Sequence, residues 1–314
     1  MSLERALELA ERGRGQVEHT HPLVGAVLVH GPDVVGEGWY AGRGSPHAEV
    51  AALEQAGERA RGATLYVTLE PCSHHGTTPP CADAIVAAGV AQVLAAAVDP
   101  NPKVNGRGLE RLRDGGVEVE VADSWEARLQ NEAWRVWIAH GRPFVTYKVA
   151  TTLDGRVSVP GSRWVSGEES RRRVHELRAA SDAVAVGMGT VRADDPALTA
   201  RDVGATKQPR RLAFGGGPLP EGSELELRSG PLEDELAALA GEGVQSLLLE
   251  GGPTLAGAFL AADLVDKLLV FVAPTLAGEG AGPVAAMPEP KVLSRLSAQT
   301  IGHDVLLEAY VHEP

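Results

Sequence analysis

The chain has 314 residues, of which 44% are hydrophobic and 23% charged; this is ordinary globular composition, and the length exceeds that of a single hydrophobic core, so we expect two domains. The 29 basic and 42 acidic residues give a net charge of −13, which opposes binding to nucleic acids and to anionic membranes. No segment approaches the roughly 20 apolar residues of a membrane helix, and the charged, amphipathic start is unlike a signal peptide, so we expect a cytoplasmic protein.

The first half of the chain alternates helices and strands. Apolar residues at helical spacing predict a helix over residues 2–13, and residues 23–40 read as two strands around a Gly-Pro turn. A helix is expected over residues 47–60, with His47 and Glu49 in its first turn. After it we expect a strand over 63–68, a cysteine-containing loop, a helix over 81–88, a strand over 92–97, a helix around Leu109 and a strand over 117–121. This alternation predicts an α/β sheet covered by helices.

A domain boundary is expected near residue 143. The segment SWEARLQNEAWRVWIAHGRP predicts a single helix that is closed by Gly141 and Pro143. We therefore divide the chain into a first domain over residues 1–143 and a second domain over residues 144–314.

The second half also mixes strands and helices. The interruptions by Gly and Pro over residues 215–230 predict a loop there. The other elements expected are a strand over 144–157, a helix over 166–180, a strand over 182–189, a strand, loop and helix over 246–262, and strands over 267–276 and 303–312.

Both cysteines of the chain lie in one short loop, PCSHHGTTPPC. Together with His47, Cys72 and Cys81 offer one imidazole and two thiolates, which suit zinc, and three protein ligands leave a fourth position open for catalysis. His47 and Cys81 are expected at helix starts, where the helix dipole favours a thiolate. Two alternatives are a structural zinc site completed by His74 or His75, and a disulfide between the cysteines.

Glu49 lies two residues after His47 and can reach the same pocket without binding the metal, as a proton shuttle requires. Zinc would activate water for attack on an amidine-like carbon, and Glu49 would carry the proton to the departing ammonia. Zinc deaminases have His-x-Glu followed by Pro-Cys-x-x-Cys, whereas here eight residues separate the cysteines. With this longer spacer, the loop resembles the deaminase half of the bifunctional riboflavin-biosynthesis deaminase/reductase family.

A Gly-rich turn in LLLEGGPTLAGAFL lies between an expected strand and helix, so its backbone N–H groups could bind a phosphate. That segment, with GRPFVTYKVATTLDGRV and VHELRAASDAVAVGMGTVRADDPALTARD, is similar to the reductase half of the same family. The resemblance implies a cytidine-deaminase-like three-layer α/β/α domain followed by a dihydrofolate-reductase-like α/β domain. It also implies one zinc ion per chain and NADPH as cofactors.

The resemblance further implies the residues of the reductase site. Arg178 and Arg201 could grip a substrate phosphate through bidentate hydrogen bonds. Lys148 is a candidate for the sugar pocket or, equally, a salt-bridged strand lysine, and Asp154 in LDG is assigned to a turn. The other substrate contacts would be Ser162, Leu198 and Glu250, and the NADPH contacts Ala150, Trp164, Thr190, Asp194, Gly252, Pro253, Thr254, Leu255, Ala256, Gly257 and Ala258.

Five positions depart from the family pattern. His21 and Ala51 stand where the family usually has Asn, Tyr40 where it has His, and Thr77 where a basic residue is common. These positions of the family recognise the pyrimidine and its phosphoribosyl group, so the choice of substrate is less firmly implied than the chemistry. Gly216 replaces a Ser that often lies near the cofactor, which bears on the choice between NADPH and NADH.

The resulting hypothesis is a two-step enzyme that deaminates 2,5-diamino-6-(5-phosphoribosylamino)pyrimidin-4-one and then reduces the ribosyl group to ribityl. One rival is a deaminase/reductase acting on a related modified pyrimidine or deazapurine. A second rival is a reductase with a catalytically inactive zinc domain, and a third is a zinc-containing nucleic-acid-binding protein, which the net charge disfavours. We expect a small phosphorylated pyrimidine as the substrate and a homo-oligomer, either dimer or tetramer.

Overall fold

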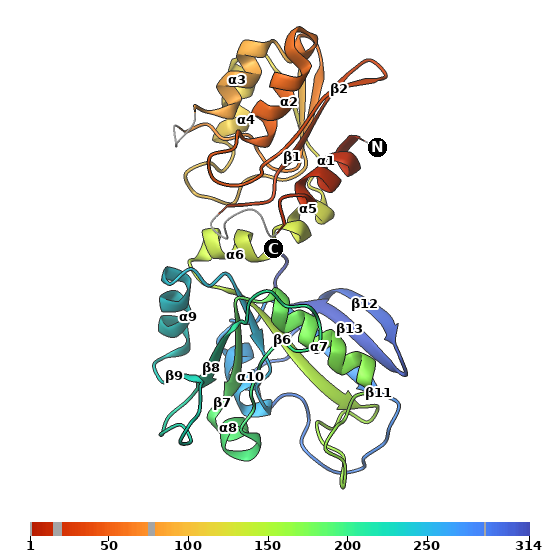
Figure 1. Cartoon of the computed structure of the whole chain (residues 1–314), viewed down its shortest axis with the longest axis vertical. Coiled ribbons are helices and arrows are strands. Elements are labelled where there is room, and N and C mark those ends of the chain that lie inside the picture. Colours follow the sequence, from red (N-terminus) through yellow and green to blue (C-terminus); the bar gives the residue numbers. More distant parts are fainter. Residues whose placement is uncertain (1, 15–20, 75–78, 286) are drawn as a thin grey trace. The chain divides into compact units, whose positions relative to one another are not determined.

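A computed structural model describes residues 2–14, 21–74, 79–285 and 287–314 (Figure 1). The chain forms two compact units. The first unit comprises residues 1–140 with Pro314, and the second comprises residues 141–313. Within the described ranges, no helix combines the length and the apolar character needed to cross a membrane.

The first unit is built on a five-stranded sheet in the order β2-β1-β3-β4-β5. Strand β1 pairs antiparallel with β2 and β3, and β3, β4 and β5 run parallel. The expected pair of strands around the Gly-Pro turn is confirmed by the β1–β2 pairing. The strands are β1 (Gly25–His30), β2 (Asp33–Trp39), β3 (Thr64–Val67), β4 (Gln92–Ala95) and β5 (Glu118–Val121).

Helices cover both faces of this sheet, which confirms the three-layer α/β/α prediction (Figure 1). Successive strand residues point to opposite faces, so Ala26 and Leu28 pack under α2 and α3 while Val27 packs under α1. A Cβ on Gly38 would lie 2.2 Å from Ala48 O, so this glycine lets α2 lie directly on β2. The helices are α1 (Ser2–Glu11), α2 (Ala48–Ala56), the 3-10 helix η1 (Gly57–Ala60), α3 (Cys81–Ala88), α4 (Arg107–Asp114), α5 (Trp125–Gln130) and α6 (Glu132–His140).

The expectation of one helix over residues 124–143 is wrong, because the helix is divided at Asn131 into α5 and α6. The Asn131 side chain accepts a hydrogen bond from Leu23 N at 2.8 Å and donates one to Leu23 O at 2.9 Å. Both bonds join residues 108 positions apart. A tertiary contact therefore interrupts a segment whose local sequence favours a helix.

The second unit is built on an eight-stranded sheet in the order β12-β13-β11-β6-β10-β7-β8-β9. Strands β11 to β9 along this order are parallel, and β13 and β12 are added antiparallel at one side. The strands are β6 (Phe144–Thr152), β7 (Ala183–Gly187), β8 (Arg210–Phe214), β9 (Glu226–Arg228), β10 (Ser246–Leu249), β11 (Lys267–Ala273), β12 (Ser294–Ile301) and β13 (Asp304–Tyr310).

Helices cover both faces of the second sheet as well. Helices α7 (Glu168–Ala180) and α8 (Met188–Asp194) pack on one face, and α9 (Leu232–Gly241) and α10 (Pro253–Ala261) pack on the other. This arrangement agrees with the predicted α/β class. The expected strand over 182–189 ends at Gly187 and continues as α8, and the stretch predicted to be a loop over 215–230 contains β9.

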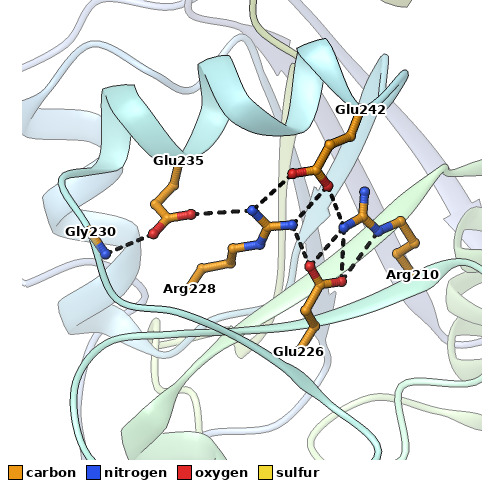
Figure 2. Close-up of polar contacts among 6 residues, drawn as sticks. All are labelled: Arg210, Glu226, Arg228, Gly230, Glu235 and Glu242. Atoms are coloured by element: carbon orange, nitrogen blue, oxygen red, sulfur yellow. Dashed lines mark hydrogen bonds and ion pairs between the residues drawn. The ribbon is translucent and has the colours of Figure 1, made fainter.

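A network of charges joins the edge strand β9 to α9 (Figure 2). Figure 2 shows the guanidinium groups of Arg210 and Arg228 between the carboxylates of Glu226, Glu235 and Glu242. Arg228 Nη2 lies 2.9 Å from Glu242 Oε2, and Arg210 Nη2 lies 2.7 Å from Glu226 Oε1. Charged side chains on an edge strand also discourage pairing with another chain.

Candidate active sites

The first unit brings His47, Cys72 and Cys81 together. His47 is the N-cap of α2, Cys81 is the first residue of α3, and Cys72 lies in the loop after β3. His47 Nδ1 lies 3.2 Å from Cys81 Sγ and 3.8 Å from Cys72 Sγ, and the three donor atoms lie within 4.8 Å of one another. Cys81 N donates to Cys72 Sγ at 3.3 Å, which joins the two cysteines directly. Both ligand positions expected at helix starts are therefore found there.

The donor set fits a zinc ion. In a tetrahedral site, bonds of about 2.0 Å to nitrogen and 2.3 Å to sulfur put neighbouring donors about 3.5–3.8 Å apart, close to the separations found here. Both cysteines are free, so the disulfide alternative is wrong. Among the described residues, the cluster has three members and the exposed His74 is not one of them. His75 and Thr77 lie outside the described residues.

The electrostatics of the cluster couple its members. Hydrogen bonding to Cys81 and to His47 lowers the pKa of the Cys72 thiol, which favours a thiolate. The hydrogen bond to Cys72 in turn raises the pKa of His47. Burial raises the pKa of Glu49 to about 7, because its side chain is only 4% exposed and lies near the Cys72 sulfur.

A cavity of about 310 Å³ opens beside the cluster. Cavities of this size hold small ligands. His21 and Tyr40 line it with their ring centroids 5.4 Å apart, and Tyr40 meets the His47 ring edge-on at 5.7 Å. Ala51 is not among the lining residues; it lies on α2 where that helix faces Gly38. Of the departures that fall within the described residues, His21 and Tyr40 are thus the two that face the cavity.

Three polar residues of the cavity were not anticipated from the sequence: Glu70, Asp99 and Asn101. Asp99 and Asn101 lie in the loop after β4, and Asn101 N donates to Asp99 Oδ1 at 2.8 Å. Burial, with a contribution from the nearby Glu70 carboxylate, raises the pKa of Asp99 to about 6. Their position after the parallel strands β3 and β4 could have indicated them, since polar residues that follow parallel strands gather at the carboxyl edge of a sheet.

In the second unit, Lys148, Arg178 and Glu250 form a charged cluster. Arg178 donates to both Glu250 oxygens, from Nε at 2.6 Å and from Nη2 at 2.9 Å. Lys148 Nζ lies 3.6 Å from Glu250 Oε2. Burial alone would raise the pKa of Glu250, but the two cations hold it below its usual value. The Arg178 fork that was expected to grip a phosphate is therefore engaged by Glu250 here, and Lys148 has the salt bridge that was its alternative assignment.

A loop over residues 197–201, hereafter the 197–201 loop, adjoins this cluster. Arg178 Nη1 donates to Thr199 O at 3.2 Å. His175 Nδ1 lies 3.0 Å from Thr199 O and 3.2 Å from Arg201 N. The Gln208 amide pairs with both backbone groups of Ala200, at 2.8 and 2.9 Å. Arg201 is exposed, whereas Leu198 is buried in the left-handed region at φ 50°. His175 and Gln208 are polar contacts of this loop that the sequence did not reveal.

The expected cofactor residues lie mainly at two helix starts after neighbouring strands. Gly252 is the N-cap of α10, with Pro253 in the first turn, so the Gly-rich turn lies where it was expected. A Cβ on Gly252 would lie 3.6 Å from Thr190 Oγ1 in the first turn of α8, so these two turns are adjacent. Free N–H groups at such turns suit phosphate groups of a dinucleotide. Arg192 Nη2 donates to Gly216 O at 2.8 Å. Gly216, which stands where the family often has Ser, therefore lies beside α8.

The remaining expected residues are more dispersed. Ala150 lies on β6 and Asp194 is the exposed last residue of α8. Ser162 and Trp164 lie between β6 and α7, where the Ser162 hydroxyl donates to Trp164 O at 2.8 Å. The Trp164 ring is about half exposed and carries two arginine side chains on its faces. Asp154 lies in a turn, as expected, and accepts hydrogen bonds from Ala277 N and Gly278 N.

Two different known families match the first and the second half of the chain. Residues 2–97 match the zinc-binding region of cytidine and deoxycytidylate deaminases. Residues 143–215 and 227–307 match the RibD C-terminal domain. The gap between the two matched ranges of the second domain, residues 216–226, lies within the Gly/Pro-interrupted stretch.

Relatives with this two-domain organisation cover nearly the whole chain. The riboflavin biosynthesis protein RibD of Aquifex aeolicus is 39% identical over 97% of this chain and 96% of its own length. The RibD protein of Escherichia coli is 39% identical over 91% of this chain and 90% of its own length. Among solved structures, Acinetobacter baumannii RibD is 36% identical, with a TM-score of 0.82 over 98% of this chain and 97% of that one.

A further solved structure carries the reaction names in its description. The diaminohydroxyphosphoribosylaminopyrimidine deaminase/5-amino-6-(5-phosphoribosylamino)uracil reductase of Thermotoga maritima is 33% identical, with a TM-score of 0.79 over 98% of this chain and 97% of that one. Identity at this level over both domains, together with the His/Cys/Cys cluster, shows more than a shared fold. The chain belongs to the RibD family, the bifunctional deaminase and reductase proteins of riboflavin biosynthesis.

Proposed function

We propose that the first unit hydrolytically deaminates 2,5-diamino-6-(5-phosphoribosylamino)pyrimidin-4-one and that the second reduces the ribosyl group of the product to ribityl with NADPH. The observation that carries the first step is the buried carboxylate of Glu49 next to three zinc-type donors at the wall of a cavity. The reaction names of the Thermotoga maritima relative support this choice of substrate.

In the deaminase site, His47, Cys72 and Cys81 would hold the zinc ion. When bound, zinc supplies Lewis-acid activation of a water molecule at neutral pH. Glu49 would hold a proton and pass it from the attacking water to the departing amino group, because its carboxylate lies in the same cavity and is not one of the three ligands. His21 and Tyr40 form the aromatic wall against which the pyrimidine lies.

In the reductase site, the first turns of α8 and α10 would hold the cofactor phosphates through Thr190 and the 252–258 segment. Ala150, Trp164 and Asp194 complete the proposed cofactor contacts. NADPH supplies the hydride, and the protein orients the sugar against it. The proposed sugar and phosphate contacts are Lys148, Ser162, Arg178, Leu198, Arg201 and Glu250.

The domain assignment is part of the proposal: residues 1–143 form the deaminase domain and residues 144–314 the reductase domain. The match of the RibD C-terminal domain begins at residue 143, which supports this boundary. We further propose that the enzyme works in the cytoplasm as a homo-oligomer, either a dimer or a tetramer.

Ammonia release from the diaminopyrimidine phosphate tests the proposal, using the zinc-loaded full chain. We expect Glu49→Gln to lower kcat by at least 100-fold, as the loss of a general acid–base group does, with unchanged zinc content. Glu54→Gln, an exposed acid on the same helix, is the matched control and should be fully active. Failure of the zinc-loaded parent to release ammonia would favour a related pyrimidine or deazapurine as the substrate.

The same variant decides whether the zinc domain is catalytic. If Glu49→Gln deaminated as fast as the parent, the first unit would not use this carboxylate and the mechanism would be refuted. Reduction of the deaminated product should be unaffected in the variant, because the second unit forms its own core. That measurement shows that the second unit is folded, and the unchanged zinc content shows the same for the first unit.

A further inference from the structure

We propose that Glu70 is a positioning residue of the deaminase site, holding in place the loop over residues 99–108, hereafter the 99–108 loop. This inference rests on the proposed function, since it concerns the same cavity. Asp99, Asn101 and Val104 reach the cavity wall from this loop. Glu70 itself follows β3 and is only 3% exposed.

The Glu70 carboxylate accepts hydrogen bonds from backbone groups at both ends of the loop. Its Oε2 accepts from Asp99 N at 3.2 Å and from Gly106 N at 2.9 Å. Its Oε1 accepts from Gly108 N at 2.8 Å and from Leu109 N at 3.4 Å. One side chain therefore closes the loop at its start and at its end.

The interior of the loop is held by its own turns. Val104 N donates to Asn101 O and Arg107 N donates to Val104 O, both at 2.8 Å. Gly106 has φ 87°, in the left-handed region that favours glycine, and it is the N-cap of α4. Because the interior is pinned by these short turns, the position of the whole loop is set by where its two ends are anchored.

The charge of Glu70 is met by amides and by the start of a helix. Gly108 N and Leu109 N belong to the first turn of α4, where the helix dipole favours an anion. Among the described residues, Glu70 has no ion pair with Lys, Arg or His. A buried carboxylate without a cation is stable only when its lone pairs are used, so the four N–H groups and the carboxylate depend on each other.

The anchor also lies against the cysteine loop. A Cβ on Gly108 would lie 1.9 Å from Pro71 O and 3.0 Å from Glu70 Oε1, so α4 touches the backbone between Glu70 and Cys72. Glu70 thus fixes the loop that bears Asp99 and Asn101 relative to the segment that bears a zinc-type donor. In the proposed reaction, the substrate must contact both, which is why the anchor should control binding.

Glu70→Gln tests the proposal, measured on the zinc-loaded full chain with the diaminopyrimidine phosphate. The amide keeps the size of the side chain but points N–H groups at backbone N–H groups on one side. We expect KM for deamination to rise at least tenfold, with kcat within threefold of the parent and zinc at one per chain. Amide hydrogen exchange should speed up in peptides covering residues 99–109 and remain unchanged over β1 to β3.

Matched variants separate positioning from stability. Glu110→Gln changes an exposed acid on α4 and should leave KM and exchange unchanged. Glu70→Asp keeps a charged acceptor on a shorter side chain and should give a smaller rise in KM than Glu70→Gln. Reduction by the second unit should be the same in all variants.

Several outcomes would overturn the inference. An unchanged KM in a Glu70→Gln protein whose 99–109 peptides exchange faster would show that substrate binding does not depend on this anchor. Loss of zinc, or unfolding of the first unit in both Glu70 variants, would show that the residue serves the fold as a whole. Absence of deamination in the parent would instead refute the proposed function, which keeps the two failures distinct.

Discussion

The two units hold the loops at their sites in different ways. In the deaminase unit a single buried carboxylate, Glu70, accepts four backbone N–H groups from the two ends of the 99–108 loop. In the reductase unit the 197–201 loop is held by Arg178, His175 and Gln208, with Arg211 Nη1 donating to Ala197 O at 3.3 Å. The first arrangement concentrates the restraint in one group, and the second distributes it over several.

This difference should govern how each site responds to damage. Replacement of the Glu70 carboxylate by an amide leaves two N–H groups without an acceptor at once, and each buried group of this kind costs about 1–3 kcal/mol. Loss of one side chain around the 197–201 loop removes one or two hydrogen bonds and leaves the others in place. One substitution at the concentrated anchor should therefore displace its loop, whereas the distributed contacts must be removed one by one for a comparable effect.

Among changes at these two loops, the largest effect is expected from Gly108→Ala, which disrupts the concentrated anchor without changing Glu70. The added Cβ would meet Pro71 O at 1.9 Å, so α4 must move away from the cysteine loop and draw the 99–108 loop with it. We expect deaminase kcat/KM to fall about 100-fold, or about 3 kcal/mol, with reduction unchanged.

The other glycines near the end of α4 are poor controls for this variant. A Cβ on Gly115 would meet Val86, and Gly116 has open space but a positive φ that strains any other residue. Asp114→Asn, an exposed change on α4, is the better control. Normal deamination by Gly108→Ala would show that this contact is not limiting.

Asp99→Asn should stabilise the same unit at neutral pH. The folded pKa of Asp99 is about 6, against about 3.9 in unfolded chains, so the folded state binds the extra proton between these values. Parent stability therefore falls as pH rises from about 4 to 6, by about 3 kcal/mol, and the Asn variant escapes this loss. Its advantage should be full at pH 7 and should vanish below pH 4.

Denaturant unfolding of the zinc-free protein measures this effect, because a bound cation would itself lower the pKa of Asp99. Tryptophan fluorescence reports mainly on the first unit, which contains four of the five tryptophans of the chain: Trp39, Trp125, Trp134 and Trp137. A constant difference between parent and variant from pH 4 to 8 would contradict the assigned titration.

Around the distributed anchor, single changes should be mild. His175→Leu and Gln208→Ala each remove contacts to the 197–201 loop, and a neutral hydrogen bond contributes about 1 kcal/mol. We expect each to raise the reductase KM about three- to tenfold, with deamination unchanged. The double variant should lose more than the sum of the two, because each side chain partly compensates for the other. His303→Leu, an exposed position in the same unit, is the control. Strict additivity would mean that the two contacts act independently.

The comparison also shows which site residues the sequence could predict. The zinc-type donors and Glu49 were predictable because two cysteines in 314 residues are too few to hold a fold together, whereas their placement after a His-Ala-Glu suits a metal site. The role of Glu70 was not predictable. A single glutamate before a proline at a strand end belongs to no periodic pattern, and its hydrogen-bond partners lie 29 to 39 residues away in the sequence. His175 likewise occupies an ordinary helical position, and its loop contacts arise only from tertiary packing.

The fold shows the same division between local and tertiary signals. Strands with buried residues, such as β6 and β11, and the turn before α10 were predicted because burial imposes a hydrophobic pattern. Strand β12 was not predicted, since all six residues between its ends are exposed and hydrophobic alternation has no core to face. The division of the 124–143 segment depends on the Asn131–Leu23 pairing, which no local pattern encodes.

The smallest effect is expected in the charge network at β9, where the restraint is most widely shared. Glu242→Gln removes one of three carboxylates around Arg210 and Arg228, and both guanidinium groups keep Glu226 as a partner. Because these groups are partly exposed, we expect a loss below about 1 kcal/mol, a fall in Tm of no more than about 4 °C, and unchanged kinetics in both units. The loss should shrink further at 0.5 M salt, where such charges are screened. A large or salt-independent loss would show that the network acts as one buried unit, as the Glu70 anchor does.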